Sequence, residues 1–549
     1  MKNRKPNAAQ IARQRLATER GAVLKDWGGR LPIAIVYPNS YFLGMSNLGM
    51  QTVYNLLNDD PDVVCERAFY DPPAGPGAAD VVSIESQRPL NDFAVIAFTL
   101  SYELDYYNVV QILRSAHIPL FAEERDGDHP LVIAGGPCMT TNPAGMAPFF
   151  DATVNGEGED VIPHLVDAIR DGLYGDRESL LDDLANIPGV YVPRRPRQHP
   201  VARQWVRDIG ATRSMTTILT PETELDDMTL IEVARGCGRA CRFCIAGYVF
   251  RPPRYRPLDD LVEQVEESMK WTKKVGLLGA AVADHPQLEE LVAAADERGA
   301  AVSISSLRVD NLSPTVLGAL SRGGTRTVTI APEAGSERMR TMINKALSED
   351  QILEAADKVG SAGMRRLKLY FMYGLPGEED DDVHAMVALG NSIKDHLDAH
   401  KKGTTLTMSV GPFVPKPATA YETQSMADEA TFKRRGEFLR KGLYRKGIEL
   451  RGEGPAWARI DDICSRADAR LADLLVELPD NTLASWKRAL PKHGLDGPLP
   501  WEGERPPWQA IDSGIKEVFF LREWDRHQQA KLTPACPPGD VTCHMCGVC

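Results

Sequence analysis

The sequence has no long hydrophobic run. Hydrophobic side chains make up 43% of its 549 residues, yet no apolar stretch reaches the roughly 20 residues that a membrane-spanning helix needs. No apolar segment of the signal-peptide kind stands near the start. We therefore expect a cytoplasmic protein without a membrane partner.

An excess of basic charge is also missing. The formal net charge is −13, which argues against attraction of the whole molecule to nucleic acid. Local basic stretches are still present, at residues 1–20 and 192–207. We expect a solvated helix and a charged linker there. The alternative is a docking surface for RNA or a ribosomal component.

Cysteine, in contrast, is plentiful. Ten cysteines in a chain expected in the cytoplasm indicate metal or redox chemistry rather than a disulfide framework. Three lie within residues 235–248, four crowd the C-terminus, and Cys65, Cys138 and Cys464 are scattered. We expect the scattered three to be small buried residues.

The length predicts several domains, because a chain of 549 residues is too long for one hydrophobic core. We place the domains at residues 1–205, 206–425 and 426–549. In the first, short β-rich runs alternate with amphipathic segments, which is typical of a doubly wound, Rossmann-like α/β sheet. Its predicted strands are residues 32–38, 93–100, 118–122, 130–136 and 150–156.

The second predicted domain is a partial or complete βα barrel. Six strand-like runs alternate there with helical segments, and the chemistry of such a barrel lies at the carboxyl ends of its strands. The runs are residues 230–235, 275–280, 301–306, 326–335, 365–374 and 404–413. The third domain, from about residue 426 onward, reads as mainly helical.

Three thiols follow the first barrel strand directly. The segment RGCGRACRFCIAGY places Cys237, Cys241 and Cys244 at C-x3-C-x2-C spacing. Three thiols can hold three irons of a [4Fe–4S] cluster and leave the fourth iron open for chemistry. The alternative is a zinc knuckle whose fourth ligand comes from elsewhere in the chain.

This motif, C-x3-C-x-Φ-C after the first strand of a βα barrel, resembles the radical S-adenosylmethionine (SAM) superfamily. The resemblance implies that SAM binds the fourth iron through its amino and carboxylate groups. Electron transfer from the cluster then cleaves SAM to a 5′-deoxyadenosyl radical. Cys237, Cys241 and Cys244 would be the catalytic metal ligands, and Phe243 would shield the cluster.

Other barrel segments carry the same resemblance. APEAGSERMRTMINK is similar to the family's fourth-strand region, where Glu333 would contact SAM or substrate. Arg308 in SSLRVD ends the third predicted strand and is a plausible partner for the SAM carboxylate, because a guanidinium matches that fork. One departure concerns the second strand: the family's GGE is absent, and the chain reads GLLGAAVADHP instead.

The first domain resembles the cobalamin-binding domain that precedes many radical SAM barrels. GMSNLG, TLS and GGP stand where that domain carries its three motifs. The implied cofactor-binding residues are Ser46, Gly49, Thr99, Ser101, Gly135 and Gly136. Ser46 stands where the family's cobalt-ligating histidine lies, and a hydroxyl is a poor cobalt ligand beside imidazole. We expect base-off cobalamin without a protein histidine; the alternative is a domain that kept the fold and lost the ligand.

Most of the chain resembles the largely uncharacterised B12-binding radical SAM proteins. The resemblance implies a cobalamin-dependent radical SAM enzyme, and we predict a C-methyltransferase acting at an unactivated carbon. The alternative is a radical SAM enzyme that methylates or thiolates RNA or a ribosomal or other protein substrate, with a vestigial B12 domain. A reductant such as flavodoxin or ferredoxin would be its partner, and the substrate stays open.

The last fourteen residues, CPPGDVTCHMCGVC, supply four more thiols: Cys536, Cys543, Cys546 and Cys549. Four thiols suffice for a closed zinc site or for a second iron–sulfur cluster. A redox-active tail that binds no metal is the third alternative.

Overall fold

The computed structural model describes residues 7–72, 80–195, 198–304, 307–309, 312–497, 506–537, 543 and 545–549. The chain forms two compact units. Unit 1 comprises residues 1–207, 212–227 and 463–514, and unit 2 comprises residues 208–211, 228–462 and 515–549. The three predicted domains stay a prediction; in the structure the C-terminal helices are shared between the two units.

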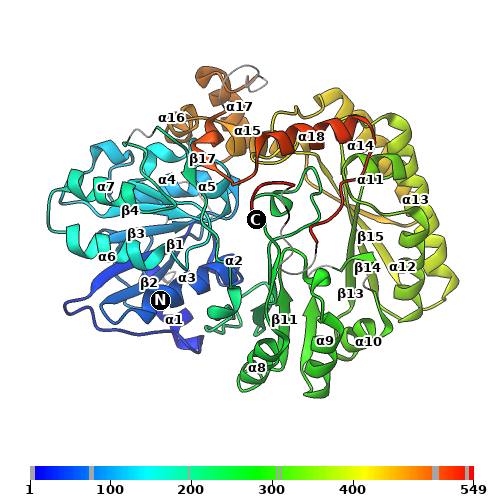
Figure 1. Cartoon of the computed structure of the whole chain (residues 1–549), viewed down its shortest axis with the longest axis horizontal. Coiled ribbons are helices and arrows are strands. Elements are labelled where there is room, and N and C mark those ends of the chain that lie inside the picture. The colour runs from blue at the N-terminus through cyan, green and yellow to red at the C-terminus, as the bar shows by residue number, and fades with distance from the viewer. Residues whose placement is uncertain are drawn as a thin grey trace, which may run out of the picture. The chain divides into compact units, whose positions relative to one another are not determined.

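Unit 1 is built around a six-stranded sheet of order β2-β1-β3-β4-β5-β6 (Figure 1). All neighbours pair in parallel except β5 and β6. The strands are β1 Leu31–Tyr37, β2 Val63–Phe69, β3 Val95–Thr99, β4 Leu131–Gly135, β5 Ala152–Val154 and β6 Val190–Tyr191. This order places a topological switch point between β1 and β3, where ligands of doubly wound sheets bind.

Helices cover the sheet of unit 1, and two very short strands, β7 Val201–Ala202 and β17 Ile511–Asp512, pair beside it. The helices are α1 Ala8–Thr18, α2 Tyr41–Gly44, α3 Leu48–Asp59, α4 Tyr106–Ser115, α5 Pro137–Thr141, α6 Ile162–Gly172, α7 Arg177–Asn186, α16 Arg470–Glu477 and α17 Leu483–Ala489. The predicted Rossmann-like α/β architecture is therefore confirmed.

Three details of the sheet differ from the prediction, the first being that the two-residue strand β6 was not predicted. The segment 118–122 forms no strand, because Arg125 donates hydrogen bonds to the carbonyls of Pro119 and Leu120 at 3.0 and 2.8 Å. Those carbonyls are thus satisfied by a side chain instead of a neighbouring strand. The strand β2 was not predicted, since its sequence VVCERAF carries two charged residues although all seven side chains are buried.

Buried ion pairs explain how β2 tolerates its charges. Arg67, in the middle of β2, contacts Glu19 at 2.6 Å and Glu85 at 2.7 Å, and its side chain is fully buried. Tyr41 donates a further hydrogen bond to Glu19. A buried charge is tolerated only where it is paired and hydrogen-bonded in this way.

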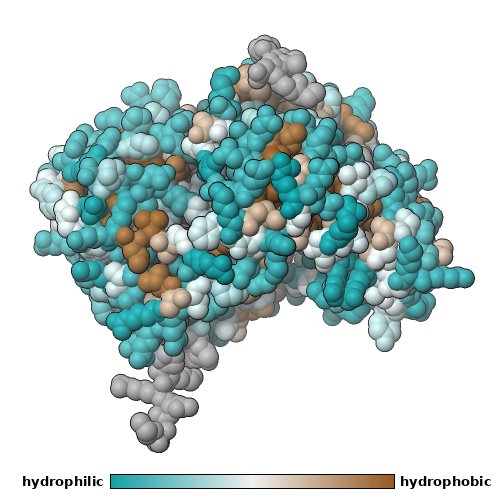
Figure 2. All heavy atoms as spheres, turned by 90° about the horizontal axis from the view of Figure 1, so that it is seen from below, coloured by the Kyte–Doolittle hydropathy of each residue, from teal (hydrophilic) through white to brown (hydrophobic). Residues whose placement is uncertain are grey.

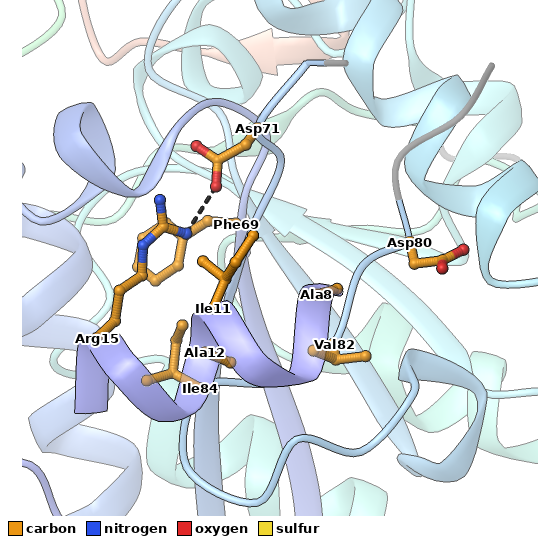
Figure 3. A pocket seen from close by; sticks show the side chains of 9 residues that line it. All are labelled: Ala8, Ile11, Ala12, Arg15, Phe69, Asp71, Asp80, Val82 and Ile84. Atoms are coloured by element: carbon orange, nitrogen blue, oxygen red, sulfur yellow. Dashed lines mark hydrogen bonds and ion pairs between the residues drawn. The ribbon is translucent and has the colours of Figure 1, made fainter. Parts of the chain in front are cut away.

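A small cavity of about 190 Å³ lies between α1 and the end of β2 (Figure 3). Ile11, Ala12 and Phe69 give it apolar walls. Arg15 and Asp71, which also line it, are paired with each other at 2.6 Å, and Asp80 adds a second carboxylate.

Unit 2 is a partial βα barrel whose strands stand in chain order (Figure 1). Parallel pairing gives one group of three strands, β12-β11-β8, and one of four, β13-β14-β15-β16. The amide of Leu307, after β12, donates to the carbonyl of Thr329 in β13 at 3.0 Å and links the two groups. The strands are β8 Thr229–Glu232, β11 Lys274–Leu278, β12 Ala301–Ile304, β13 Thr327–Glu333, β14 Arg366–Tyr373, β15 Thr405–Pro412 and β16 Glu449–Arg451.

Six helices of unit 2 pack on the outer side of its strands (Figure 1). They are α8 Leu258–Ser268, α9 Leu288–Glu297, α10 Pro314–Arg322, α12 Glu349–Ser361, α13 Asp380–Ala399 and α14 Glu429–Tyr444. Two further helices, α11 Glu337–Met342 and α18 Glu517–Gln528, pack against each other. A two-stranded ribbon, β9 Ala234–Arg235 with β10 Arg254–Tyr255, follows β8, and α15 Pro455–Arg466 leads from unit 2 into unit 1.

All six predicted barrel strands are confirmed, as is the mainly helical character of the C-terminal region. The short seventh strand β16 was not predicted, because three residues between two helices carry no readable alternation. Among the described residues, no helix is both long and apolar enough to cross a membrane. Figure 2 shows a face on which hydrophilic side chains dominate.

A buried carboxyl in unit 1 gives a pH-dependent prediction. Asp105, 5% exposed, accepts a hydrogen bond from Asn39 at 2.7 Å, and burial raises its pKa from 3.8 to about 6. Because the folded-state pKa lies above the unfolded value, this group costs the folded state little at pH 4 and increasingly more through pH 6. We expect Asp105→Asn to raise the free energy of unfolding by about 1–3 kcal/mol at pH 8.

Urea unfolding at pH 8 and pH 4 tests this expectation. At pH 4 the gain from Asp105→Asn should nearly vanish, whereas the exposed Asp183→Asn should change little at either pH. A gain of equal size at both pH values would contradict the assigned cause.

Candidate active site

The three-thiol loop begins where β8 and β9 end. Gly236 turns the chain with a φ of +78°, and a Cβ there would lie 2.1 Å from the carbonyl oxygen of Phe250. Only glycine fits such a close approach. The next residue is Cys237, so the tight turn sets where the first thiol lies.

The rest of the loop is fastened by residues from the end of α11. Asn344 donates to the carbonyls of Arg239 and Ala240 at 2.9 and 3.1 Å. The thiol of Cys241 faces the carbonyl oxygen of Asn344 at 3.6 Å. Backbone bonds from Cys244 to Cys241 and from Gly247 to Cys244 close two further turns. The loop is therefore held at both of its later thiols.

Arg242 anchors the same loop from inside the protein. Its guanidinium is fully buried and donates to the carbonyls of Met342 and Lys531 at 2.6 and 2.8 Å. It also pairs with Glu523 of α18 at 3.2 Å, and that side chain is fully buried as well. One side chain thus ties the loop to α11 and to the C-terminal segment.

The three thiols line one cavity of about 200 Å³ in unit 2. The cavity lies at the carboxyl ends of β8, β11, β12 and β13, where βα barrels carry their chemistry. Its lining includes the predicted residues Cys237, Cys241, Phe243, Cys244, Arg308 and Glu333, together with Arg239, Asp284 and Lys345. The structure thus brings every predicted barrel site residue together.

Charged pairs organise the far wall of this cavity. Asp284 accepts two hydrogen bonds from Arg239 at 2.6 and 2.8 Å, and Arg308 approaches it to 3.7 Å. Asp284 follows the second barrel strand, in the segment GLLGAAVADHP that replaces the family's GGE. A carboxylate is therefore present beside the cavity even though the GGE motif is absent.

Glu333 is placed by an irregularity in its strand. The register of β13 against β14 shifts between Ile330 and Glu333, and Glu333 takes a left-handed φ of +69°. A non-glycine residue in this region costs about 1–3 kcal/mol, and a bulge re-aims a side chain. Glu333 pairs with Lys345 at 3.3 Å. Burial lowers the pKa of Lys345, but Glu333 and the Cys241 thiol more than offset this and leave the pKa raised.

The donor set fits an iron–sulfur cluster. Burial, with the neighbouring thiols, raises the pKa of Cys237 to about 11 and that of Cys244 to about 12, and binding to iron offsets that cost because metals favour the thiolate. In the part of the chain that the structure describes, no three His, Cys, Asp or Glu side chains gather closely enough for one metal ion. A cubane needs a wider spacing, since each thiolate binds its own iron.

His285, beside Asp284, does not line the cavity but bonds to the neighbouring backbone. Its ring is 4% exposed, with Nε2 at 2.9 Å from the carbonyl oxygen of Arg256, and Nδ1 accepts from the amide of Gln287. Burial lowers its pKa. A buried histidine with both nitrogens occupied is a structural residue.

In unit 1, the residues that match the cobalamin motifs follow the carboxyl ends of β1, β3 and β4. The hydroxyl of Ser46 donates to the carbonyl of Phe42 at 2.8 Å and accepts from the amide of Glu224 at 2.9 Å. Ser101 accepts from Asn47 at 3.2 Å. The loops after β1 and β3 are thereby joined across the switch point.

The matching glycines also have roles in the fold. A Cβ on Gly136, whose φ is +103°, would lie 2.5 Å from the carbonyl oxygen of Leu100, so the two loops touch there. Gly135 pairs with Thr99 at the ends of β4 and β3. Gly49 lies in the first turn of α3, where a Cβ would come within 3.3 Å of the Asn47 side chain.

Family comparisons decide the identity of unit 2. Residues 231–390 match the family described as the radical SAM superfamily, and residues 49–193 match radical SAM proteins, N-terminal. An uncharacterized protein of Methanocaldococcus jannaschii is 31% identical over 450 residues, which are 81% of this chain and 90% of that protein. The chain belongs to the radical SAM superfamily.

Two further comparisons are more distant. This radical SAM protein is 24% identical over 318 residues to an uncharacterized methyltransferase of Pyrococcus horikoshii, covering 55% of this chain and 64% of that protein. A structure of the cobalamin-dependent SAM radical enzyme OxsB superposes with a TM-score of 0.49 at 12% identity, covering 91% of this chain and 79% of that chain.

Sequence reasoning missed several residues that build this site. Arg242 and Asn344 carried no signal, because a single arginine between two cysteines and an asparagine after a helix have many uses. Lys345 lies within the quoted segment APEAGSERMRTMINK, so its place at the motif's end was the available signal. Tyr421 was also missed; it packs in the core that contains Ala240 of the loop, and its hydroxyl meets His527 Nδ1 at 2.8 Å.

The anchoring role of Arg242 predicts a large loss of stability on its removal. Arg242→Ala should lower the free energy of unfolding by about 3–5 kcal/mol, because Glu523 would remain buried without its partner. Arg434→Ala is the matched control: its pair with Asp380 is 58% and 51% exposed, so the loss should stay below about 1 kcal/mol. Similar losses in a denaturant titration would contradict the anchor.

Proposed function

We propose that this radical SAM protein binds a [4Fe–4S] cluster through Cys237, Cys241 and Cys244 and cleaves SAM reductively. The resulting radical would serve methylation of an unactivated carbon, with cobalamin as the methyl carrier in unit 1. The observation that carries the proposal is the single cavity shared by three thiols, Arg308 and Glu333. When bound, the cluster supplies the electron that breaks a carbon–sulfur bond of SAM.

The cavity side chains suit the polar groups of SAM. Arg308 presents a guanidinium whose fork matches a carboxylate, and Asp284 holds it by a carboxylate contact at 3.7 Å. Asp284 also offers the negative charge that an amino group needs. Glu333, fixed by Lys345, can accept hydrogen bonds from hydroxyl groups of SAM or substrate. Phe243 supplies apolar cover next to the last thiol.

The edge of unit 1 fits a bound cofactor by its topology, since β1 and β3 border a switch point. The residues that would hold cobalamin are Ser46, Gly49, Thr99, Ser101, Gly135 and Gly136. Both hydrogen-bonding roles of the Ser46 hydroxyl are taken by the chain itself, and residues 38–47 contain no histidine. Cobalamin would therefore bind base-off without a nitrogen from this loop.

The alternative is modification of RNA or protein with a vestigial cobalamin domain. Its sequence support was the basic stretch at residues 192–207. Arg194 and Arg195 contact Glu178 at 2.9 and 3.0 Å, and Arg195 also pairs with Asp182. Acidic side chains of α7 thus already neutralise part of this stretch, which favours the charged-linker interpretation. A cytoplasmic flavodoxin or ferredoxin is the proposed electron donor.

Loss of one cluster thiol tests the cleavage reaction. Anaerobically reconstituted protein should release 5′-deoxyadenosine from SAM under strong reductant, measured by chromatography. Cys241→Ala should fall to the level of the enzyme-free control, because the cluster loses one of three ligands. Cys464→Ala, a buried cysteine of α15, should keep the activity. Cleavage by Cys241→Ala would rule out the proposed cluster.

Cobalamin binding separates methyl transfer from the alternative. We expect the wild-type protein to bind cobalamin with a base-off visible spectrum and an electron paramagnetic resonance signal without splitting from an axial nitrogen. Ser46→Ala should bind equally well, since the hydroxyl bonds to Phe42 and Glu224 and not to cobalt. A protein that cleaves SAM yet binds no corrinoid would favour the alternative.

A further inference from the structure

The C-terminal segment turns back from α18 into unit 2 (Figure 1) and lies against the three-thiol loop. The amide of Cys536 donates to the carbonyl of Gly238 at 2.9 Å. A Cβ on Gly238 would come within 2.8 Å of the Cys536 Cβ, so this glycine permits the close approach. Gly238 directly follows the loop thiol Cys237. The backbone hydrogen bond from Cys536 to Gly238 therefore places the first C-terminal cysteine beside the three-thiol loop.

Further contacts hold the segment in that place. The amide of Thr533 donates to Asn344, and its hydroxyl donates to Glu523, at 2.8 and 2.7 Å. Asn344 and Glu523 are the partners of the three-thiol loop described above. The segment is therefore fixed by the same buried groups that fix the loop.

The four C-terminal thiols gather at this place. Cys536 interacts electrostatically with Cys543, Cys546 and Cys549, although eight or more residues separate Cys546 and Cys549 from it in sequence. Cys546 is 2% exposed and belongs to the core that contains Tyr248 and Phe519. Cys549 is exposed. The group thus reaches from the core of unit 2 to its surface.

Three basic residues lie beside these thiols, and one of them, Arg251, interacts with sulfur directly. Arg251, 3% exposed, forms a hydrogen bond to Cys546 and interacts with Cys536. Lys516 donates its amide to the carbonyl of Cys546 at 2.8 Å, and Arg522 donates to the carbonyl of Met545 at 3.2 Å. Four thiolates around a [4Fe–4S] core leave a net negative charge, and buried cations with hydrogen bonds to sulfur stabilise such a charge.

The sequence spacing of the thiols favours a cluster over a zinc ion, because two successive C-x2-C steps run from Cys543 through Cys546 to Cys549. A zinc ion holds four sulfurs at about 2.3 Å from one point, and no three described His, Cys, Asp or Glu side chains gather closely enough for one ion. A cubane holds each thiolate on a different iron and so accepts a wider group.

We propose that Cys536, Cys543, Cys546 and Cys549 bind a second [4Fe–4S] cluster that passes electrons to the cluster of the three-thiol loop. The relay role rests on the proposed function of that loop. A low-potential one-electron donor of the ferredoxin or flavodoxin class reduces the second cluster near the exposed Cys549. The second cluster then gives up that electron and is reoxidised, and the loop cluster is reduced by one electron.

Metal content tests the second cluster independently of SAM cleavage. Anaerobically reconstituted full-length protein should contain about eight iron atoms per chain, four for each cluster. The triple variant Cys237→Ala, Cys241→Ala, Cys244→Ala should keep about four, with a [4Fe–4S] signal in electron paramagnetic resonance after reduction. Zinc in place of iron, or no metal in this variant, would overturn the proposal even if the wild type cleaves SAM.

Two variants distinguish ligand loss from misfolding. Cys546→Ser removes a buried ligand, and the exposed Cys549→Ala removes one without opening the core. Both should lose the signal of the second cluster and about four irons, while Cys464→Ala should retain about eight. Full iron content in Cys549→Ala and Cys546→Ser would overturn the assignment of these ligands.

The relay is tested by the choice of reductant. With reduced ferredoxin, Cys549→Ala should release 5′-deoxyadenosine at least about tenfold more slowly than the wild type, a change of about 1.4 kcal/mol in barrier. With titanium(III) citrate, a small reductant that can reach the loop cluster directly, the two rates should agree. Equal slowing with both reductants, or no slowing with ferredoxin, would overturn the relay.

Discussion

The buried guanidinium of Arg242 is the contact on which the architecture of unit 2 depends. Its donors reach the carbonyls that end α11 and begin the C-terminal segment, and its charge is balanced by Glu523 of α18. Three segments far apart in sequence therefore meet at one side chain. Since Arg242 lies between Cys241 and Cys244, the same side chain fixes both the position of the thiols and the packing of the C-terminal segment.

This arrangement explains why the reactive loop can be both glycine-rich and well positioned. Small residues let the backbone curl around a cluster, but they contribute little packing of their own. Asn344 and Arg242 supply the missing order through hydrogen bonds to the loop carbonyls and to the end of α11. The flexible composition of the loop is compensated by rigid partners outside it, which is how precise sites are usually supported.

Much of the fold was readable from the sequence because its strands alternate with helices at regular distances. All six barrel strands follow from short apolar runs, and so does the Rossmann-like sheet of unit 1. The misses have physical causes. In β2, Arg67 is paired with Glu19 and Glu85, which are remote from it in sequence. In residues 118–122, two backbone carbonyls accept hydrogen bonds from Arg125 instead of from a neighbouring strand. A hydropathy pattern along the sequence predicts neither the buried ion pairs nor the side-chain hydrogen bonds between residues remote from each other.

The motif residues of the site were predictable from the sequence, but the residues that hold them in place were not. The spacing of the three cysteines indicates the cluster, and the resemblance supplied Arg308 and Glu333, which lie in the same cavity. Asp284 stands where the family's acidic motif is absent, and only the fold shows that it faces Arg239 and Arg308.

The left-handed backbone of Glu333 also limits which sequences this position can accept. A φ of +69° is comfortable for glycine and tolerable for asparagine or aspartate, but it is strongly disfavoured for β-branched side chains. Two separate requirements therefore apply to position 333: its side chain must be a carboxylate, and its backbone must adopt a left-handed conformation. Aspartate meets both requirements in part, whereas a β-branched apolar residue such as valine meets neither, so few replacements are workable at this position.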